Sequence, residues 1–292
     1  MSDDIVFDPT TPLTPGGNLR RRQLVSRLAE YGATAAAVLA VAVLVIVIYT
    51  VMARGASAIS FDFLVEAAPG GVGPELVGTA IIVAIATAIA MPLGVLIAVF
   101  VTELGGNRGI QAIRLTLDLM NGLPSIIIGL FIFELLVNHH KQSGFAASVA
   151  LSIIMLPLIA RGTQEVLLLV PNSLREAADA LGVSRWRTVL GVVLPSARGG
   201  ILTSTVLSIA RAAGETAPLI LVTSVFDPGQ YSLNPFEALP NIPVRIFQLS
   251  EEANPAGFAE AWGLALVLVA FILFANLGAR ALLNRSRTKL TS

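Results

Sequence analysis

Six long apolar stretches, separated by shorter polar ones, set the pattern of this chain. The runs at 31–53, 75–101, 115–137, 145–168, 199–226 and 261–283 are rich in Ala, Val, Ile and Leu. Because a helix rises about 1.5 Å per residue, each run is long enough to cross the roughly 30 Å of hydrocarbon in a bilayer. The pattern predicts an all-α integral membrane protein with six transmembrane helices.

The polar segments divide the chain into four parts. We expect an N-terminal tail at 1–28, a first transmembrane helix with an external loop at 29–74, a main membrane domain at 75–283, and a C-terminal tail at 284–292. The segment at 227–260 contains five prolines, at 228, 235, 240, 243 and 255. A connection this long is uncommon unless it is functional, so it is predicted to be an external surface for a partner.

The basic residues predict the orientation in the membrane. If the odd-numbered spans run outward, 15 of the 19 Lys and Arg residues fall on one side. Because basic residues concentrate in cytoplasmic loops, that side is predicted to be the cytoplasm, together with both termini. The 15 residues are Arg20, Arg21, Arg22, Arg27, Arg108, Arg114, Arg161, Arg175, Arg185, Arg187, Arg198, Arg280, Arg285, Arg287 and Lys289.

The composition supports this class and excludes others. The chain is 55% hydrophobic and 13% charged, with a mean hydropathy of +0.79, which does not describe a soluble domain. It has no cysteine and only two histidines, the adjacent His139 and His140, for which a solvated loop is favoured over a metal site. We expect no cofactor and no nucleic-acid partner, and membrane lipid surrounds the chain.

The stretch Arg-Ala-Ala-Gly-Glu-Thr-Ala-Pro at 211–218 places charges inside the fifth apolar run. An arginine at the centre of a bilayer costs about 2.5–3.5 kcal/mol on insertion scales, so Arg211 requires a partner, and Glu215 lies one helical turn away. Gly214 and Pro218 weaken the helix there, and a half-helix restarting beyond them would present N–H groups suited to an anion. The alternative is a purely structural ion pair.

Polar residues in the third run extend the predicted pathway. The sequence Asn-Gly-Leu-Pro-Ser at 121–125 combines polar side chains with helix breakers at membrane depth. Such residues usually face a bundle interior. The predicted pathway residues are Arg211, Glu215, Thr216, Asn121 and Ser125.

Residues 170–198 interrupt the apolar pattern with a predicted pair of short helices. Ser173 and Glu176 have the spacing of a capping box, Gly182 is placed to end the first helix in a left-handed conformation, and Ser184 can cap the second. The result is a basic projection on the cytoplasmic side. The alternative is an amphipathic helix that rests on lipid headgroups.

Within this segment, Glu176-Ala-Ala178, Gly182 and Val192-Val-Leu-Pro195 resemble the EAA loop of ABC-importer permeases. That pattern is EAA, three residues, Gly, nine residues, Ile, one residue and Leu-Pro, and Val192 replaces the Ile. The resemblance implies a type I ABC importer permease fold in which about Ser173–Gly182 is a cytoplasmic coupling helix that docks on an ATPase subunit. The residues it assigns to coupling are Ser173, Glu176, Ala177, Ala178, Gly182, Leu194 and Pro195.

Three further stretches resemble the phosphate-specific branch of that family. They are residues 121–129, residues 211–218 and the external Ala-Leu-Pro at 238–240 with Pro-Val-Arg-Ile at 243–246. The resemblance implies a bacterial inner-membrane importer of inorganic phosphate, with a second homologous permease, two ATPase subunits and an external phosphate-binding protein.

The chain contains no Gly-x-x-x-x-Gly-Lys-Ser/Thr motif, so ATP hydrolysis is expected from the separate subunits rather than from this chain. The alternatives are a sulfate or molybdate permease of the same family and a secondary transporter, although a secondary transporter gives no reason for the cytoplasmic helix pair. An intramembrane enzyme is disfavoured because the sequence offers no Ser/His dyad or metal-ligand pair.

Overall fold

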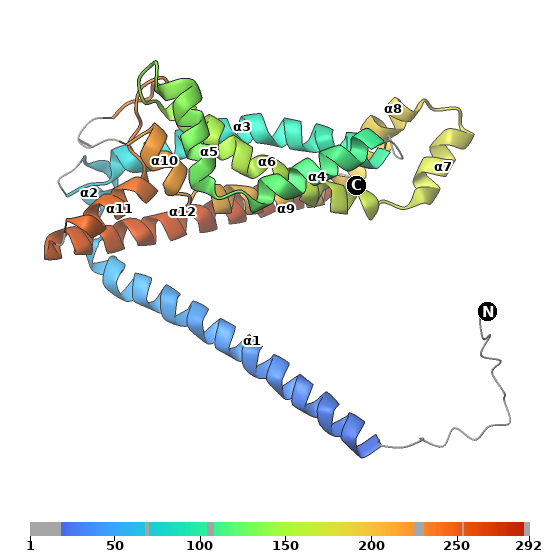
Figure 1. Cartoon of the computed structure of the whole chain (residues 1–292), viewed down its shortest axis with the longest axis horizontal. Coiled ribbons are helices and arrows are strands. Elements are labelled where there is room, and N and C mark those ends of the chain that lie inside the picture. Colours follow the sequence, from blue (N-terminus) through green and yellow to red (C-terminus); the bar gives the residue numbers. More distant parts are fainter. Residues whose placement is uncertain (1–18, 68–69, 104–107, 225–230, 253, 289–292) are drawn as a thin grey trace. The chain divides into compact units, whose positions relative to one another are not determined.

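The computed structural model describes residues 19–67, 70–103, 108–224, 231–252 and 254–288 (Figure 1). Every regular element in these ranges is a helix, as predicted. Most of the predicted N-terminal tail, and the last four residues of the predicted C-terminal tail, lie outside them. The chain forms two units, Met1–Thr50 and Val51–Ser292.

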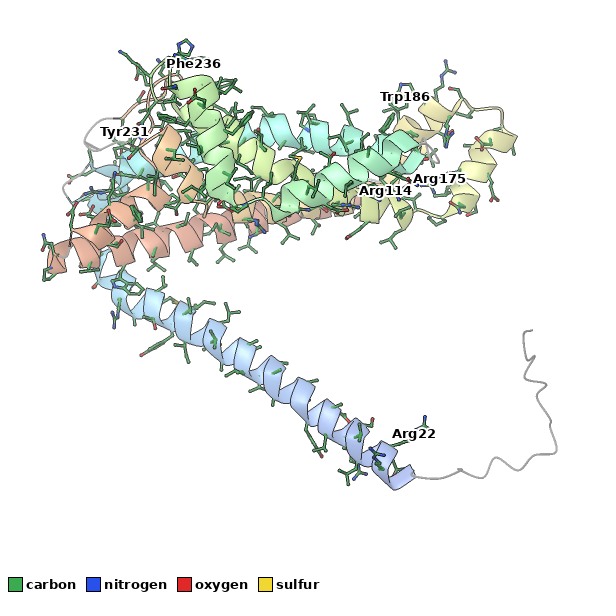
Figure 2. All side chains as sticks on the ribbon, viewed as in Figure 1. Arg22, Arg114, Arg175, Trp186, Tyr231 and Phe236 are labelled. Carbon is green, nitrogen blue, oxygen red and sulfur yellow. The ribbon has the colours of Figure 1, made fainter. Side chains whose placement is uncertain are left out.

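The first unit consists mainly of helix α1 (Leu19–Gly55). Basic residues that include Arg22 stand at its N-terminal end (Figure 2), and the following turns are apolar on every face. A helix without a polar stripe is suited to lipid or to a buried helix contact. The predicted first span is therefore confirmed as a helix, and it is longer than the predicted 31–53.

Five helical stretches are long and apolar enough to cross a membrane: Arg21–Ala58, Gly73–Glu103, Gly144–Leu168, Arg185–Ala212 and Pro255–Gly278. They contain α1, α3 (Gly73–Glu103), α6 (Gly144–Leu168), α9 (Leu194–Ala212) and the first two-thirds of α12 (Pro255–Thr288). Counting one bent helix pair as a span brings the number within the described residues to six.

The bent pair corrects the prediction of a straight third span at 115–137. Helix α4 (Arg108–Gly122) and helix α5 (Ser125–Ile132), which continues through a π turn at Phe133–Val137, meet at an angle of 100°. The break is at Leu123 and Pro124. Proline lacks an N–H and disfavours helical geometry in the residue before it, so the α4 hydrogen-bond ladder cannot continue.

The fifth span also differs from the predicted 199–226. The helix begins at Arg185 with α8 (Arg185–Thr188), passes through a π turn at Val189–Val193 and continues as α9 to Ala212. Pro195 therefore does not start the span, because it lies inside a continuous helix just after the π turn. A four-residue break then precedes the short helix α10 (Ala217–Val222).

Small residues allow α3 and α6 to pack closely along the centre of the second unit. Ala86 and Ala90 of α3 and Ala147 and Ala150 of α6 are fully buried in one apolar core. Gly94 comes so close to Ile159 that an added Cβ would lie 2.9 Å from the isoleucine Cγ2. Close approach through small residues is the usual way in which membrane helices associate.

Much of the proline-rich external segment is core rather than free surface. Leu239 and Ile242 are fully buried, and Asn241 caps α11 (Ile242–Glu251) by accepting a hydrogen bond from the Val244 N–H at 3.1 Å. The Thr79 hydroxyl accepts from the Ile242 N–H at 3.0 Å. The prediction of a partner surface is therefore wrong for 239–244, where the segment closes one end of the bundle over α3. On its described remainder, Tyr231, Leu233 and Phe236 stay exposed.

One glycine contact can be tested directly. A Cβ on Gly129 of α5 would lie 2.6 Å from the Pro218 Cα of α10, which is backbone and cannot move aside easily. We expect Gly129→Leu to cost at least about 1–3 kcal/mol through overpacking and to lower the midpoint of thermal unfolding in detergent. Gly109→Ala is the control, since nothing lies within 4 Å of that position, and it should unfold at or slightly above the wild-type temperature. Equal midpoints for both variants would contradict the packing of α5 on α10.

Candidate functional site

A cavity of about 200 Å³ lies where the two broken helices of the second unit meet. It combines the α4–α5 break with the end of α9 and with two apolar side chains of α6. The cavity is lined by Met120, Asn121, Leu123, Pro124, Ser125, Ile128, Ile154, Leu158, Arg211 and Glu215. Four of the five predicted pathway residues are thus brought together, from segments about 90 positions apart in the sequence.

Arg211 and Glu215 form the predicted pair, but the contact is loose. The Arg211 Nε lies 3.8 Å from the Glu215 Oε1, and the side chains are 59% and 18% exposed. This distance is too long for a hydrogen bond, and no group among the described residues accepts one from the guanidinium. A planar cation with several unused N–H donors in a cavity wall can bind an oxyanion through two parallel hydrogen bonds.

The predicted half-helix after Glu215 is present as α10, but the helix whose first residue lines the cavity is α5. Ser125 is the first residue of α5, and the N–H groups of a first turn have no acceptor within their own helix. With the π turn, this helix extends to Val137, whereas α10 has only six residues. The positive end of the longer helix dipole therefore adjoins the cavity beside Arg211.

Thr216 does not line the cavity. It immediately precedes α10, is half-buried, and its backbone carbonyl accepts from the Ile220 N–H at 3.1 Å. The expectation that Thr216 belongs to the pathway rested only on its position beside Glu215. Its geometry is that of a residue at the start of a helix.

A second ion pair, which sequence reasoning did not pair, fastens the broken span. Arg161 of α6 donates to Asp118 of α4 and, at 3.0 Å, to the carbonyl of Arg114. Both charges lie within predicted apolar runs, and this position was the sequence feature that could have indicated a pair. Since Asp118 is one turn before Asn121, the pair fixes α4 against α6 next to the cavity.

The segment after α6 forms the predicted pair of short helices, α7 (Asn172–Ala180) and α8. Gly182 has a φ of +69°. Its N–H donates to the Asp179 carbonyl at 2.9 Å, and the Val183 N–H donates to the Ala178 carbonyl at 3.0 Å. These two bonds form a Schellman motif, so the predicted left-handed cap is confirmed.

The predicted side-chain caps at the helix starts are wrong. Helix α7 has Pro171 rather than Ser173 as its N-cap, two residues earlier than predicted, so Ser173 lies inside the first turn and makes no capping bond with Glu176. The fixed φ of Pro171 starts the helix without a side-chain acceptor. Ser184 does precede α8, but its carbonyl, not its hydroxyl, accepts from the Thr188 N–H at 3.0 Å.

The residues assigned to coupling differ in their surroundings. Glu176, Ala177 and Gly182 are exposed, Ala178 is the one buried residue of α7, and the exposed Leu174, Leu181 and Trp186 add apolar surface. Leu194 packs against a buried cluster at the ends of α3 and α6, and Pro195 is exposed on the continuous helix. Leu194 therefore belongs to the packed base of the projection.

A family comparison decides what kind of protein carries this cavity and projection. Residues 90–288 match the family described as "Binding-protein-dependent transport system inner membrane component". The chain belongs to this permease family. Family membership implies a second permease, an ATPase and a substrate-binding protein as partners, and makes the chain a multi-pass component of the inner membrane that does not itself hydrolyse ATP.

Individual relatives of the permease cover nearly its whole length. It is 35% identical over 293 residues to the "Phosphate transport system permease protein PstA 1" of Mycobacterium tuberculosis, with 96% of this chain and 94% of the relative covered. It is 36% identical over 241 residues to the protein named PstA in Haemophilus influenzae, covering 80% and 85% of the two chains.

Solved structures support the fold of the permease. A bacterial alginate ABC transporter has a chain that matches with a TM-score of 0.63 at 15% identity, covering 90% of the permease and 98% of that chain. The methionine ABC transporter MetNI matches with a TM-score of 0.58 at 20% identity, covering 74% and 94%. The predicted type I importer permease fold is confirmed.

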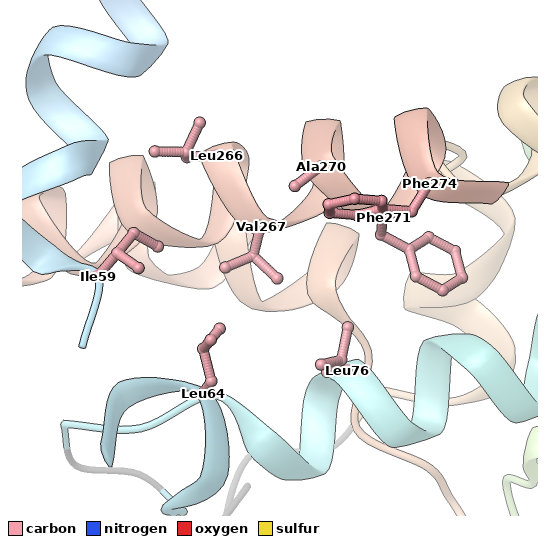
Figure 3. A pocket seen from close by; sticks show the side chains of 8 residues that line it. All are labelled: Ile59, Leu64, Leu76, Leu266, Val267, Ala270, Phe271 and Phe274. Atoms are coloured by element: carbon pink, nitrogen blue, oxygen red, sulfur yellow. The ribbon is translucent and has the colours of Figure 1, made fainter. Parts of the chain in front are cut away.

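A larger groove of about 380 Å³ elsewhere in the permease has no polar lining (Figure 3). It lies between Leu64, Leu76 and the side chains that α12 presents, among them Val267 and Phe271. An anion placed there would lose its hydration without gaining a hydrogen bond. The smaller, polar cavity at Arg211 is therefore the better candidate for a charged substrate. No cluster of metal-ligating side chains occurs within the described ranges.

The left-handed turn at Gly182 predicts a sensitive position in the projection. Gly182→Ala should destabilise the α7 cap by about 1–2 kcal/mol, because a Cβ is unfavourable at positive φ even where space is free. The loss would appear as faster protease cleavage at 180–184 in the purified permease. Gly182→Asn is the matched control and should be cleaved more slowly than the alanine variant, since Asn tolerates this conformation. Equal cleavage rates for wild type and both variants would refute the requirement for a left-handed conformation at position 182.

Proposed function

We propose that this permease forms half of the pathway by which an ATP-driven importer carries inorganic phosphate across the bacterial inner membrane. The observation that carries the proposal is the cavity that brings the loosely paired Arg211 together with Asn121, Ser125 and the start of α5. The names of the curated relatives, which are phosphate transport system permeases, point to the same substrate.

The chemistry of the cavity suits a tetrahedral oxyanion. Arg211 supplies a positive charge, Asn121 and Ser125 supply hydrogen-bonding side chains, and the first turn of α5 supplies N–H donors. Glu215 holds the arginine and competes with the anion for it. That competition keeps binding weak enough for release, which transport requires.

The exposure of Arg211 accounts for the need of a second permease. At 59% exposed, its side chain would be too costly to leave against lipid, so a homologous subunit that closes the other side of the pathway stabilises it. We place both termini and the α7–α8 projection in the cytoplasm, on the basis of the distribution of basic residues. Two ATPase subunits then dock from below, and an external phosphate-binding protein delivers the anion from above.

We assign the coupling role to α7 and its cap, which project from the bundle with Glu176, Ala177 and Gly182 exposed. The exposed Leu174, Leu181 and Trp186 give an ATPase subunit apolar surface to bury. The alternative, an amphipathic helix on lipid headgroups, would bury the same residues, and the uptake measurements on the projection distinguish it from coupling.

The substrate assignment is tested by removing the cavity charges. In vesicles that contain the whole transporter, Arg211→Ala should lower phosphate uptake about 10-fold or more, which corresponds to the loss of a charge-assisted contact. Glu215→Gln should also lower uptake, because the arginine loses its orientation. Arg211→Lys is the matched control and should retain more uptake than the alanine variant. Wild-type uptake in the alanine and glutamine variants, with normal assembly, would refute the site.

Competition for uptake separates phosphate from the sulfate or molybdate alternative. In the same vesicles, excess unlabelled phosphate should abolish the uptake of labelled phosphate, whereas sulfate and molybdate should leave it unchanged. Strong competition by sulfate would favour the alternative.

The coupling role is tested in the projection. Glu176→Ala and Gly182→Pro should leave membrane insertion intact while ATP turnover continues and phosphate uptake falls, because the docked motor loses its mechanical contact. Ser196→Ala is a nearby control, since its exposed hydroxyl bonds only to the Val192 carbonyl of its own helix. Normal uptake by the Gly182→Pro variant would contradict the assignment.

A further inference from the structure

A partly buried arginine next to Glu176 connects the projecting helix to the membrane helices. Arg175 lies on α7, and its side chain is 23% exposed. Its Nη2 lies 2.9 Å from the Oε1 of Glu103, the last residue of α3, and its Nε donates to the Glu103 Oε2 at 3.4 Å. Figure 2 shows Arg175 at the end of the second unit that carries α7 and α8.

The same guanidinium also holds the end of α6. Its Nη2 donates to the Leu167 carbonyl at 3.1 Å and its Nη1 to the Val170 carbonyl at 2.8 Å. Leu167 is in the last turn of α6 and Val170 follows directly. The Leu167 carbonyl also accepts from the Val170 N–H at 3.3 Å, so the arginine adds to a backbone turn and bonds two carbonyls at this helix end and a carboxylate together.

Little else attaches α7 to the bundle. Of its nine residues, Ala178 alone is buried, and the remaining side chains other than Arg175 are exposed. Glu103, by contrast, is 8% exposed at the end of a helix whose dipole disfavours a negative charge there. Arg175 compensates that charge. The attachment is therefore one multidentate contact rather than a broad packed face.

The contact leads directly to the candidate transport cavity. Helix α6 supplies Ile154 and Leu158 to the cavity wall, and Leu158 is about 14 Å along the helix axis from Leu167 at 1.5 Å per residue. Since α3 and α6 pack through small side chains, a pull on both of their ends moves them together.

We propose that Arg175 and Glu103 form the strut that transmits movement of the ATPase-docked helix α7 to α3 and α6, and so to the walls of the transport cavity. The proposal rests on the proposed function, because it assumes that α7 receives the motor. Arg175 is a positioning residue, since it touches neither the anion nor ATP. The guanidinium serves five acceptors at once, since its Nη1 also donates to the Asn172 Oδ1 at 3.2 Å, and a lysine with three N–H donors cannot satisfy them all.

The test measures how many ATP molecules are hydrolysed per anion moved. The complete transporter, reconstituted in proteoliposomes with its binding protein, is compared as wild type, Arg175→Lys, Arg175→Ala and Glu103→Gln. We expect the ratio of ATP hydrolysed to phosphate moved to rise about 5-fold or more in Arg175→Ala, with smaller rises in Arg175→Lys and Glu103→Gln. Arg114→Ala is the matched control, since that side chain is exposed on the cytoplasmic half and contributes only its backbone carbonyl to a contact (Figure 2).

Each outcome decides the proposal. A merely structural role would lower the yield of assembled complex and reduce both rates together, leaving the ratio at its wild-type value, and that result overturns the strut. If Arg175→Ala fails to assemble, Arg175→Lys and Glu103→Gln decide by the same ratio. Failure of the proposed function is distinguishable, because the wild-type transporter itself would then move no phosphate. In that case the measured quantity is the stimulation of ATP hydrolysis by the binding protein. The strut predicts that this stimulation is smaller in the variants than in the wild type.

Discussion

The structure depends on one constraint: inside hydrocarbon, every backbone polar group needs a partner, so a membrane helix can be interrupted only where protein or water replaces lipid. This chain interrupts two of its spans, at Leu123–Pro124 and after Ala212. Both interruptions face the same cavity. The freed backbone groups and the charges of Arg211 and Glu215 then share one polar space, which is costly for stability and useful for carrying an anion.

The helices around this polar space are tightly packed and apolar. The contact between α3 and α6 is rich in alanine and glycine, and the end of the bundle near Thr79 is closed by buried residues such as Leu239 and Ile242. Rigid packing on either side means that the cavity changes shape when whole helices shift, not when single side chains do. A substrate-binding protein and an ATPase would act on such a structure by shifting whole helices.

Hydrophobic patterning predicted the class, the number of spans and most of their positions, because a helix in lipid needs apolar side chains along its whole length. It failed where the backbone departs from a regular helix. The 100° bend between α4 and α5 and the continuation of the fifth span back to Arg185 depend on how particular turns hydrogen-bond, and a proline allows several outcomes. Ser173 has the spacing of a cap, but Pro171 starts the helix instead.

Part of the candidate cavity could also be predicted from the hydrophobic pattern. Charges and amides are rare at membrane depth, so Asn121, Ser125, Arg211 and Glu215 stood out individually. Their convergence, the exclusion of Thr216 and the role of α5 required the three-dimensional path of the chain. The contact between Arg175 and Glu103 had no local signal at all, because it joins residues 72 positions apart.

The π turn at Val189–Val193 affects how the helix before it, α8, is rotated relative to the helix after it, α9. A π turn accommodates one residue more than the α-helix would, so it offsets the helix before it from the helix after it by about 100° of rotation. Because the wide turn absorbs that residue, α9 and Arg211 keep the orientation toward the projection that an α-helix one residue shorter would give. An insertion or deletion within α9 itself has no such turn to absorb it and would rotate Arg211 by about 100° relative to the projection.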